Sequence, residues 1–178
     1  MEIVTDPTKL HQKSKLLSRE EILSGEMQKF LGELMDFSKS GKYGVGLSAI
    51  QVDKPVAVTV ITSRPTPNRP ELEVFDKICI NLKIEEGIGE KEPMWEGCCS
   101  VLGEDSLPIY AEIPRYKAVR VSYLDENGEP HEEMVEGFIA HVMQHEADHI
   151  EGRIITDLVD RSQFISYDEF HKIMQERK

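Results

Sequence analysis

The segment Gln144-His145-Glu146-Ala147-Asp148-His149-Ile150-Glu151-Gly152 contains the pattern His-Glu-x-x-His. On an α-helix, residues four apart lie on one face and one turn from each other. His145 and His149 at that spacing can bind the same metal ion, and Glu146 beside them can accept a proton from a water molecule at the site. The segment therefore predicts a metal-binding helix that also carries a general base.

Apolar residues around this pattern recur at spacings of three and four, which predicts a helix. They are Phe138, Ile139, Val142, Met143, Ala147 and Ile150. Gly137 lies where the helix would begin, and Gly152 lies where it would end. The competing interpretation is an acidic surface helix whose histidines bind nothing. We favour metal binding, because a shuffled chain of this composition would contain the pattern only about once in forty.

Length and composition limit the classes of protein that this chain can belong to. A chain of 178 residues is long enough for one domain with a hydrophobic core, so we expect a single domain. The formal net charge of −12 repels phosphate backbones and argues against nucleic acid as the main ligand. No apolar run approaches the roughly 18 residues of a membrane helix, and the N-terminus has no signal-peptide pattern. We therefore expect a cytoplasmic protein without a membrane partner.

The three cysteines are Cys79, Cys98 and Cys99. Neighbours in sequence cannot form an ordinary unstrained disulfide, so a framework of disulfides is not expected. Reduced thiols fit this pattern better, and one of them is a candidate metal ligand.

Short β-rich runs occupy the middle of the chain. Val56 to Thr62 and Ile78 to Ile84 have the composition of strands. Lys117 to Leu124 alternates between apolar and polar residues, and Pro130 to Glu136 can pair with it. Between these two runs, Asp125-Glu126-Asn127-Gly128 predicts a hairpin turn.

Helices are predicted on either side of this block of strands. Ser18-Arg19-Glu20-Glu21 has the form of a capping box, and a helical apolar pattern follows through about Lys39. Ile154 to Leu158 is predicted as a short strand and Asp168 to Glu176 as a terminal helix. Because the two long helices are separated by strands, the predicted class is α+β rather than parallel α/β.

A catalytic metal site needs a third protein ligand and an open coordination position. One protease pattern requires a histidine six residues after His149, but Ile155 stands there. Glu169 could complete a thermolysin-like zinc endopeptidase, and Cys98 could instead supply a thiolate. Spacing alone does not choose between these two residues. His141 lies about 12 Å from His149 along the helix axis, too far to bind the same ion.

Three segments together resemble the motifs of peptide deformylases, which read roughly GxGLAAxQ, EGCLS and QHExDHLxG. In this chain they are Gly44-Val45-Gly46-Leu47-Ser48-Ala49-Ile50-Gln51, Glu96-Gly97-Cys98-Cys99-Ser100 and the His-Glu-x-x-His segment, in the same order. The resemblance extends from residue 6 to about residue 158, and three ordered motifs are much more specific than one. It implies a single peptide-deformylase-like catalytic domain over residues 1–178, with mostly antiparallel strands around a central metal-binding helix.

The resemblance implies a role for each site residue. One divalent ion, Fe²⁺ natively with Zn²⁺ or Ni²⁺ as alternatives, would be bound by Cys98, His145 and His149. Glu146 would be the general base and then the acid. The oxyanion would be held by the side-chain amide of Gln51 and the backbone N–H of Cys99. Gly46 and Gly89 would lie along the backbone of the bound peptide. The pocket for the methionine side chain would be lined by Val45, Phe138 and His141.

The implied reaction is hydrolysis of the formamide of N-formylmethionyl nascent peptides, with release of formate. This is a step of N-terminal processing in protein biosynthesis. The ribosome is then a candidate partner, although the C-terminal segment Gln175-Glu176-Arg177-Lys178 offers only two basic residues. We expect a monomer or a weak dimer with no nucleic-acid specificity of its own.

The chain departs from the family pattern at several positions. Ser48 replaces the usual alanine, Cys99 replaces the usual leucine, and His141 stands where many members have arginine or an aliphatic residue. Val101 to Tyr110 is longer and more acidic than usual, with no arginine before Arg115. These changes leave the metal chemistry intact and leave the peptide specificity open.

Two alternatives remain at this point. The first is a zinc endopeptidase that uses His145, His149 and Glu169. The second is a non-catalytic deformylase-like metal-binding protein that has kept the site and changed the substrate cleft.

Overall fold

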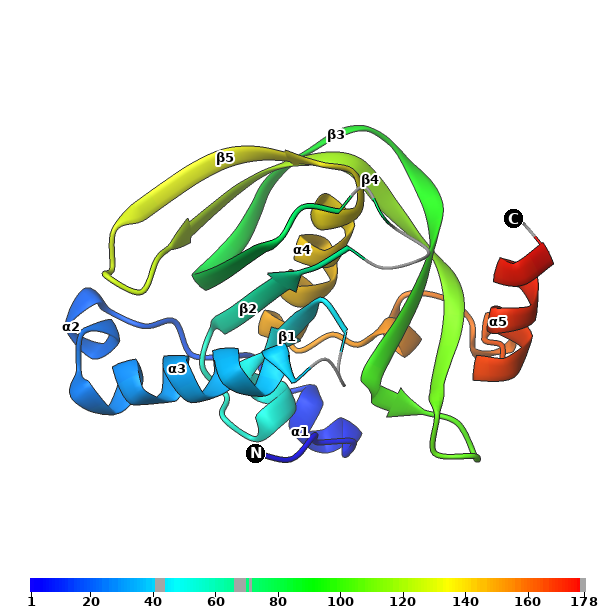
Figure 1. The fold of residues 1–178 in the computed structure, drawn as a ribbon, viewed down its shortest axis with the longest axis horizontal. Coiled ribbons are helices and arrows are strands. Elements are labelled where there is room, and N and C mark those ends of the chain that lie inside the picture. The colour runs from blue at the N-terminus through cyan, green and yellow to red at the C-terminus, as the bar shows by residue number, and fades with distance from the viewer. Residues whose placement is uncertain (41–43, 66–69, 71, 177–178) are drawn as a thin grey trace.

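An antiparallel sheet with the strand order β1-β2-β3-β4-β5 organises the computed structural model, which describes residues 1–40, 44–65, 70 and 72–176 (Figure 1). Each strand pairs with the next one along the chain. The strands are β1 (Gly46–Ser48), β2 (Val58–Ser63), β3 (Phe75–Leu102), β4 (Pro108–Leu124) and β5 (Pro130–Glu136).

Five α-helices and three 3₁₀ helices are found among the described residues. The α-helices are α1 (Pro7–Leu10), α2 (Arg19–Ile22), α3 (Gly25–Lys39), α4 (Gly137–Ile150) and α5 (Tyr167–Glu176). The 3₁₀ helices are η1 (Ala49–Val52), η2 (Ile155–Asp157) and η3 (Arg161–Gln163). In the described residues, no helix is both long and apolar enough to cross a membrane.

The long hairpin of β3 and β4 bends over the central helix α4 (Figure 1). Strand β3 has 28 residues, and its pairing with β4 shifts register at four places. Such irregularities increase local twist and bend a strand, so the hairpin curves instead of extending as a flat ribbon. The run predicted from Ile78 to Ile84 is therefore only the first part of a much longer strand.

Helix α4 begins directly after β5, where Gly137 has a φ of +63°. Glycine adopts this left-handed conformation without steric cost, which allows an abrupt change from strand to helix. The inner side of α4 then packs on the sheet. This core cluster includes Ala140, Met143, Ala147 and Ile150 from the helix, Ile61, Cys79, Val119 and Val121 from the strands, and Ala57, which directly precedes β2. Burial of these apolar side chains fixes α4 under the sheet.

Two predicted elements differ from the structure. The helix predicted from Ser18 to Lys39 is divided in two, because Ser24 caps a new helix by accepting a hydrogen bond from Met27 N at 3.3 Å. The strand predicted from Ile154 to Leu158 is wrong. The Asp157 carboxylate accepts a hydrogen bond from Ile154 N at 2.8 Å, and this local turn forms η2 instead.

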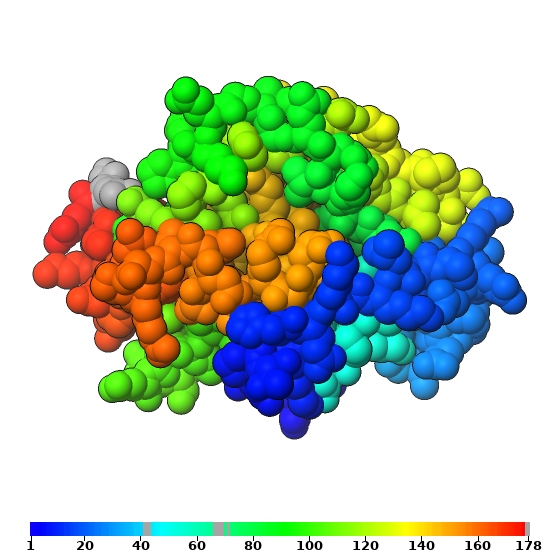
Figure 2. Space-filling model, turned by 180° about the vertical axis from the view of Figure 1, so that it is seen from behind, coloured from blue at the N-terminus to red at the C-terminus, as the bar shows by residue number. Residues whose placement is uncertain are grey.

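On the face turned away from the viewer in Figure 1, the chain after α4 lies against the N-terminal segment (Figure 2). Ser14 N donates to Ile150 O at 2.9 Å, and the His11 ring is 3.0 Å from the Asp157 carboxylate. Gly152 has a φ of +73°, and a Cβ on it would lie 2.6 Å from His11 O. Glycine is thus required both by the backbone conformation and by the close approach of the two segments.

We expect Gly152→Ala to lower the free energy of unfolding by about 1–3 kcal/mol, because alanine at this φ is strained. Urea denaturation of both proteins measures the difference. The control is Gly32→Ala in α3, where a Cβ would meet nothing within 4 Å. That change should stabilise the protein by up to about 1 kcal/mol. Equal stability of Gly152→Ala and the parent chain would contradict the steric argument.

Candidate active site

Three side chains that can ligate a metal meet beside α4. Ligand atoms of Cys98, His145 and His149 all lie within 4.8 Å of one another. Cys98 Sγ is 3.4 Å from His149 Nε2, and the two imidazole rings are 4.9 Å apart at 83°. Within the described ranges, no other set of three such side chains is found. His141 and Glu169 are not part of this group.

An irregular part of β3 brings Cys98 to this position. Gly97 pairs with Tyr110, and the next pair along the strands is Leu102 with Pro108. Residues 98–101 of β3 therefore oppose a single residue of β4, which makes a large bulge. A bulge changes the direction of side chains, and here Cys98 is buried against α4.

The donor set fits a divalent metal ion. A thiolate with two imidazoles suits Zn²⁺ or Fe²⁺. His145 Nδ1 donates to the Glu96 carboxylate at 2.8 Å, so the lone pair of Nε2 is free for an ion. Burial lowers the pKa of His149 well below its usual value, with a further contribution from nearby His145. His149 is therefore neutral, which is the form that binds metals.

The carboxylate of Glu96 is the centre of a buried hydrogen-bond network. It accepts from His141 Nε2 at 2.6 Å, from His145 Nδ1 at 2.8 Å and from Arg115 Nε at 2.6 Å. Arg115 Nη1 in turn donates to Asp148 at 2.6 Å. Burial alone would raise the pKa of Glu96, but the hydrogen bonds from both histidines and from Arg115 hold that pKa well below its usual range.

The network changes the interpretation of His141. This residue lines the cavity, as predicted for the methionine pocket, but its Nε2 is bonded to Glu96. Glu96 accepts from both histidines, so His141 helps to hold the carboxylate that orients His145. Sequence reasoning missed Glu96 as a functional residue, although it lies in the second family motif.

The general-base candidate Glu146 is fully buried next to Ser48. Ser48 Oγ donates to Glu146 Oε2 at 2.7 Å. Burial raises the pKa of Glu146, although His145 and the Ser48 hydrogen bond act in the opposite direction. Gly46 also touches this carboxylate, because a Cβ on Gly46 would collide with Glu146 Oε1. Small residues on β1 thus leave room for the Glu146 side chain.

The side-chain amide nitrogen of Gln51 points towards residues 98–100 of β3. Its Oε1 accepts from Ser48 N at 2.9 Å, which fixes the orientation of the amide. Its Nε2 lies 3.5 Å from Cys98 Sγ, 3.4 Å from Cys99 Sγ and 3.2 Å from Ser100 Oγ. The predicted oxyanion donors Gln51 and Cys99 therefore lie together next to Cys98, one of the three candidate metal ligands. Their roles stay predictions.

A cavity of about 280 Å³ opens onto these residues. Its lining includes many of the predicted site residues, namely Val45, Gly46, Gln51, Cys98, Cys99, Phe138, His141, His145 and Glu146. Seven further lining residues were not predicted; Gly44, Glu96 and Gly97 belong to the family motifs, whereas Trp95, Tyr110, Val142 and Phe170 lie outside them. Trp95 precedes the second motif directly, whereas no local sequence signal connects Phe170 with the site.

Two candidate residues lie elsewhere. Gly89 is in the bent part of β3 with a φ of +77° and is not among the residues that line the cavity. Its predicted contact with a peptide backbone therefore has no support in the cavity geometry. Glu169 is exposed, and its carboxylate accepts from Ser166 N at 2.9 Å at the start of α5. The third ligand proposed for a zinc endopeptidase is thus not at the metal group.

Comparison with known proteins assigns the family. The model of the polypeptide deformylase family matches residues 1–164. The chain belongs to the polypeptide deformylase family. A peptide deformylase of Aquifex aeolicus is 33% identical over 159 residues, which cover 89% of this chain and 88% of that protein. One from Chromohalobacter salexigens is 32% identical over 157 residues, covering 88% and 84%.

Solved deformylase structures share the fold. A class I type b peptide deformylase from Acinetobacter baumannii, crystallised with Met-Ala-Ser, superposes with a TM-score of 0.78 at 28% identity. The superposition covers 89% of this chain and 98% of that one. A deformylase from Arabidopsis thaliana gives a TM-score of 0.74 at 28% identity and covers 99% and 89%. The predicted family and the α+β deformylase fold are confirmed.

We expect Glu96→Gln to weaken zinc binding by this deformylase by about 10- to 100-fold, because the neutral amide no longer orients His145 as a carboxylate does. Competition with a chromophoric zinc chelator measures the affinity. The control is Glu92→Gln on the same strand as Glu96, which removes an exposed ion pair with Lys117 of β4. Unchanged zinc affinity in Glu96→Gln would show that this carboxylate does not support the metal ligands.

Proposed function

We propose that this chain removes the formyl group from N-formylmethionyl peptides and releases formate. The observation that carries this proposal is the convergence of Cys98, His145 and His149, two of which, Cys98 and His145, line the same cavity as the buried Glu146 carboxylate. Membership of the deformylase family supports the same reaction. Metal dependence is a property of that family.

The three ligands would hold one divalent ion, and we propose Fe²⁺ as the native metal with Zn²⁺ or Ni²⁺ as substitutes. A sulfur and two nitrogens accept each of these ions. When bound, such an ion supplies Lewis acidity, which polarises the formyl group and favours hydroxide at neutral pH.

Glu146 would move the proton in this reaction. Its carboxylate is fixed by Ser48, and Glu146 lines the same cavity as Cys98 and His145. It would accept a proton from the attacking water and deliver it to the leaving amine nitrogen. The raised pKa of this buried group favours such a return of the proton, because a base of very low pKa would not hold it.

Gln51 and the backbone N–H of Cys99 would stabilise the oxygen that gains charge as the formyl carbon becomes tetrahedral. Gln51 is already oriented by its bond from Ser48 N, so its amide need not reorganise during the reaction. Preorganised donors of this kind contribute about 3 kcal/mol each to transition-state stabilisation.

The apolar part of the cavity next to α4 would accept the methionine side chain. Val45 and Phe138 line it, with the ring of His141 beside them. The related Acinetobacter baumannii enzyme was crystallised with Met-Ala-Ser. A tripeptide with a free N-terminal methionine is what deformylation of the corresponding formyl peptide would leave.

The proposal extends to the cellular setting. Nascent chains carry N-terminal formylmethionine, so they are the proposed substrates, and the ribosome is a candidate partner. The basic residues Arg177 and Lys178 lie outside the described residues. We further propose a single catalytic domain over residues 1–178 that acts in the cytoplasm as a monomer or weak dimer.

The test of this function is formate release from formyl-Met-Ala by the metal-loaded protein, purified without oxygen. Cys98→Ala should lose both bound metal and activity, because it removes a ligand. Glu169→Gln should retain both, whereas a zinc endopeptidase would lose them. Metal binding without formate release from any formyl-Met peptide would favour a non-catalytic protein.

Gly46→Ala should lower kcat for formate release by about 100-fold, because the new methyl group displaces the Glu146 carboxylate from the reacting atoms. Metal content, measured by elemental analysis, should stay at the level of the parent chain, since no ligand is changed. Gly32→Ala is the matched control, with open space around its Cβ. Full activity of Gly46→Ala would contradict the assigned position of the base.

A further inference from the structure

Three aromatic side chains from separate elements line the cavity that Cys98 and His145 also line. They are Trp95 from β3, Tyr110 from β4 and Phe170 from α5, and we name them the aromatic wall. Each of these residues is half-buried, so their rings are not fully used in the hydrophobic core. None of them belongs to the three deformylase motifs.

The aromatic wall is a layered arrangement. Tyr110 pairs with Gly97, and a Cβ on Gly97 would collide with the Tyr110 ring, so this ring lies flat over the glycine backbone. Phe170 stacks on Tyr110 with ring centroids 3.9 Å apart and an angle of 3° between the planes. Trp95 stands at the side of Phe170, 5.5 Å away and tilted by 55°. The result is one continuous apolar surface.

A backbone connection places α5 at this surface. Tyr110 N donates to Ile165 O at 3.0 Å, and Ile165 N donates to Tyr110 O at 2.8 Å. The chain therefore runs beside β4 immediately before α5 begins, which brings Phe170 over Tyr110. No residue of α5 is fully buried. Helix α5 thus contributes Phe170 to the wall and has no fully buried side chain.

The cavity lining carries no permanently charged basic side chain among the described residues. None of the described residues that line it is a lysine or an arginine. The Glu96 carboxylate is bonded by the Arg115 guanidinium and by two histidine rings. Burial, together with Tyr167 nearby, raises the pKa of Tyr110, so this ring is neutral at neutral pH. The wall is therefore suited to uncharged apolar groups.

Trp95 is held in the wall by packing alone. Its indole N–H is buried and has no hydrogen-bond acceptor among the described residues. A buried indole N–H usually has an acceptor, so a polar group of a bound peptide could supply the partner that this one lacks.

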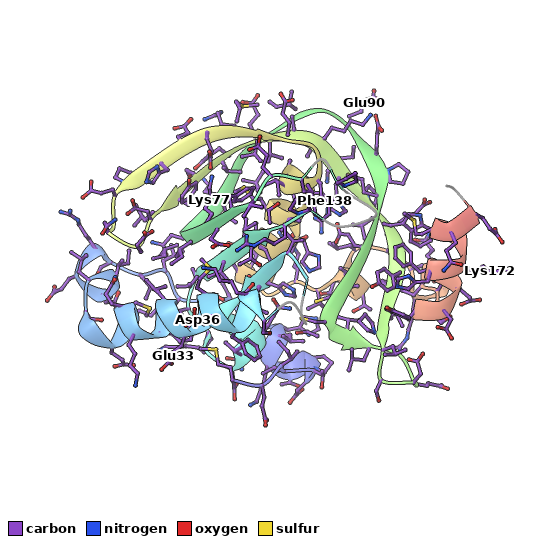
Figure 3. The ribbon with its side chains drawn as sticks, viewed as in Figure 1. Glu33, Asp36, Lys77, Glu90, Phe138 and Lys172 are labelled. Atoms are coloured by element: carbon purple, nitrogen blue, oxygen red, sulfur yellow. The ribbon has the colours of Figure 1, made fainter. Side chains whose placement is uncertain are left out.

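We propose that the aromatic wall binds an apolar, and best an aromatic, side chain of the peptide substrate downstream of its methionine. Helix α5 is then part of the substrate site. The inference rests on the proposed deformylation, since the methionine would occupy the part of the cavity near α4. Figure 3 shows Phe138 on the α4 side of the β3–β4 hairpin and Lys172 on α5 beyond that hairpin. A peptide that extends from the metal group towards α5 would reach the wall.

The fluorescence of the unmodified protein tests this inference, because Trp95 is the only tryptophan of the chain. The metal-loaded protein is titrated with the product peptides Met-Phe-Ala and Met-Gly-Ala. Met-Phe-Ala should change the emission with a Kd about three- to tenfold lower than that of Met-Gly-Ala, as expected from one added aromatic contact. Equal Kd values for the two peptides would overturn the proposal.

Kinetics of a variant give a second test. The ratio of kcat/KM for formyl-Met-Phe-Ala to that for formyl-Met-Gly-Ala should exceed one in the parent chain and approach one in Phe170→Ala, mainly through KM. Phe170→Leu, which keeps apolar bulk, should retain part of the preference. The matched control is Lys172→Ala, an exposed position on the same helix, which should keep the parent ratio.

The outcomes separate this inference from the proposed function. No formate from either peptide would reject the deformylase activity itself. Formate release with equal kcat/KM for the two peptides in the parent chain would retain the activity and reject the role of the wall. If Phe170→Ala lowers thermal stability by detaching α5, the fluorescence titration of the unmodified protein decides the question without that variant.

Discussion

The buried carboxylate of Glu96 connects the elements that form the site. It belongs to β3, and it accepts hydrogen bonds from Arg115 on β4 and from His141 and His145 on α4. A buried charge is tolerated only when its partners compensate for the lost hydration. These three elements must therefore come together with little freedom, and the same requirement orients His145, a candidate metal ligand. Asp148 on α4 completes the network by binding the other side of the Arg115 guanidinium.

The curvature of the sheet gives the second condition for the site. Strands β3 and β4 bend around α4, and the bulge after Gly97 turns Cys98 towards the histidines. Because α4 is packed by its apolar side against the sheet, its His-Glu-x-x-His face is presented to this bulge. Rigid strands and a buried helix thus hold the ligands, which suits a site that must be organised before a substrate binds.

Local patterns in the sequence predicted the elements whose structure depends on near neighbours. The histidine spacing and the apolar periodicity predicted α4, and the Asp125–Gly128 turn predicted the β4–β5 hairpin, both of which the structure contains. The break at Ser24 and the turn at Asp157 were missed, since a single side-chain hydrogen bond decides each of them. Spacing also could not select Cys98 over Glu169. That choice depended on the family resemblance, and the structure places only Cys98 at the metal group.

Contacts between distant parts of the chain explain what could not be predicted at the cavity. Phe170 lies 70 residues beyond the end of the second motif, yet its ring stacks on Tyr110 because Ile165 pairs with that residue through the backbone. The division between residues inside and outside the family motifs also bears on the proposed function. The candidate metal ligands and Glu146 come from the family motifs, whereas the aromatic wall comes from β4, α5 and a residue before the second motif. If the wall binds peptide as proposed, changes in it would alter which peptides bind while leaving the candidate ligands and Glu146 in place.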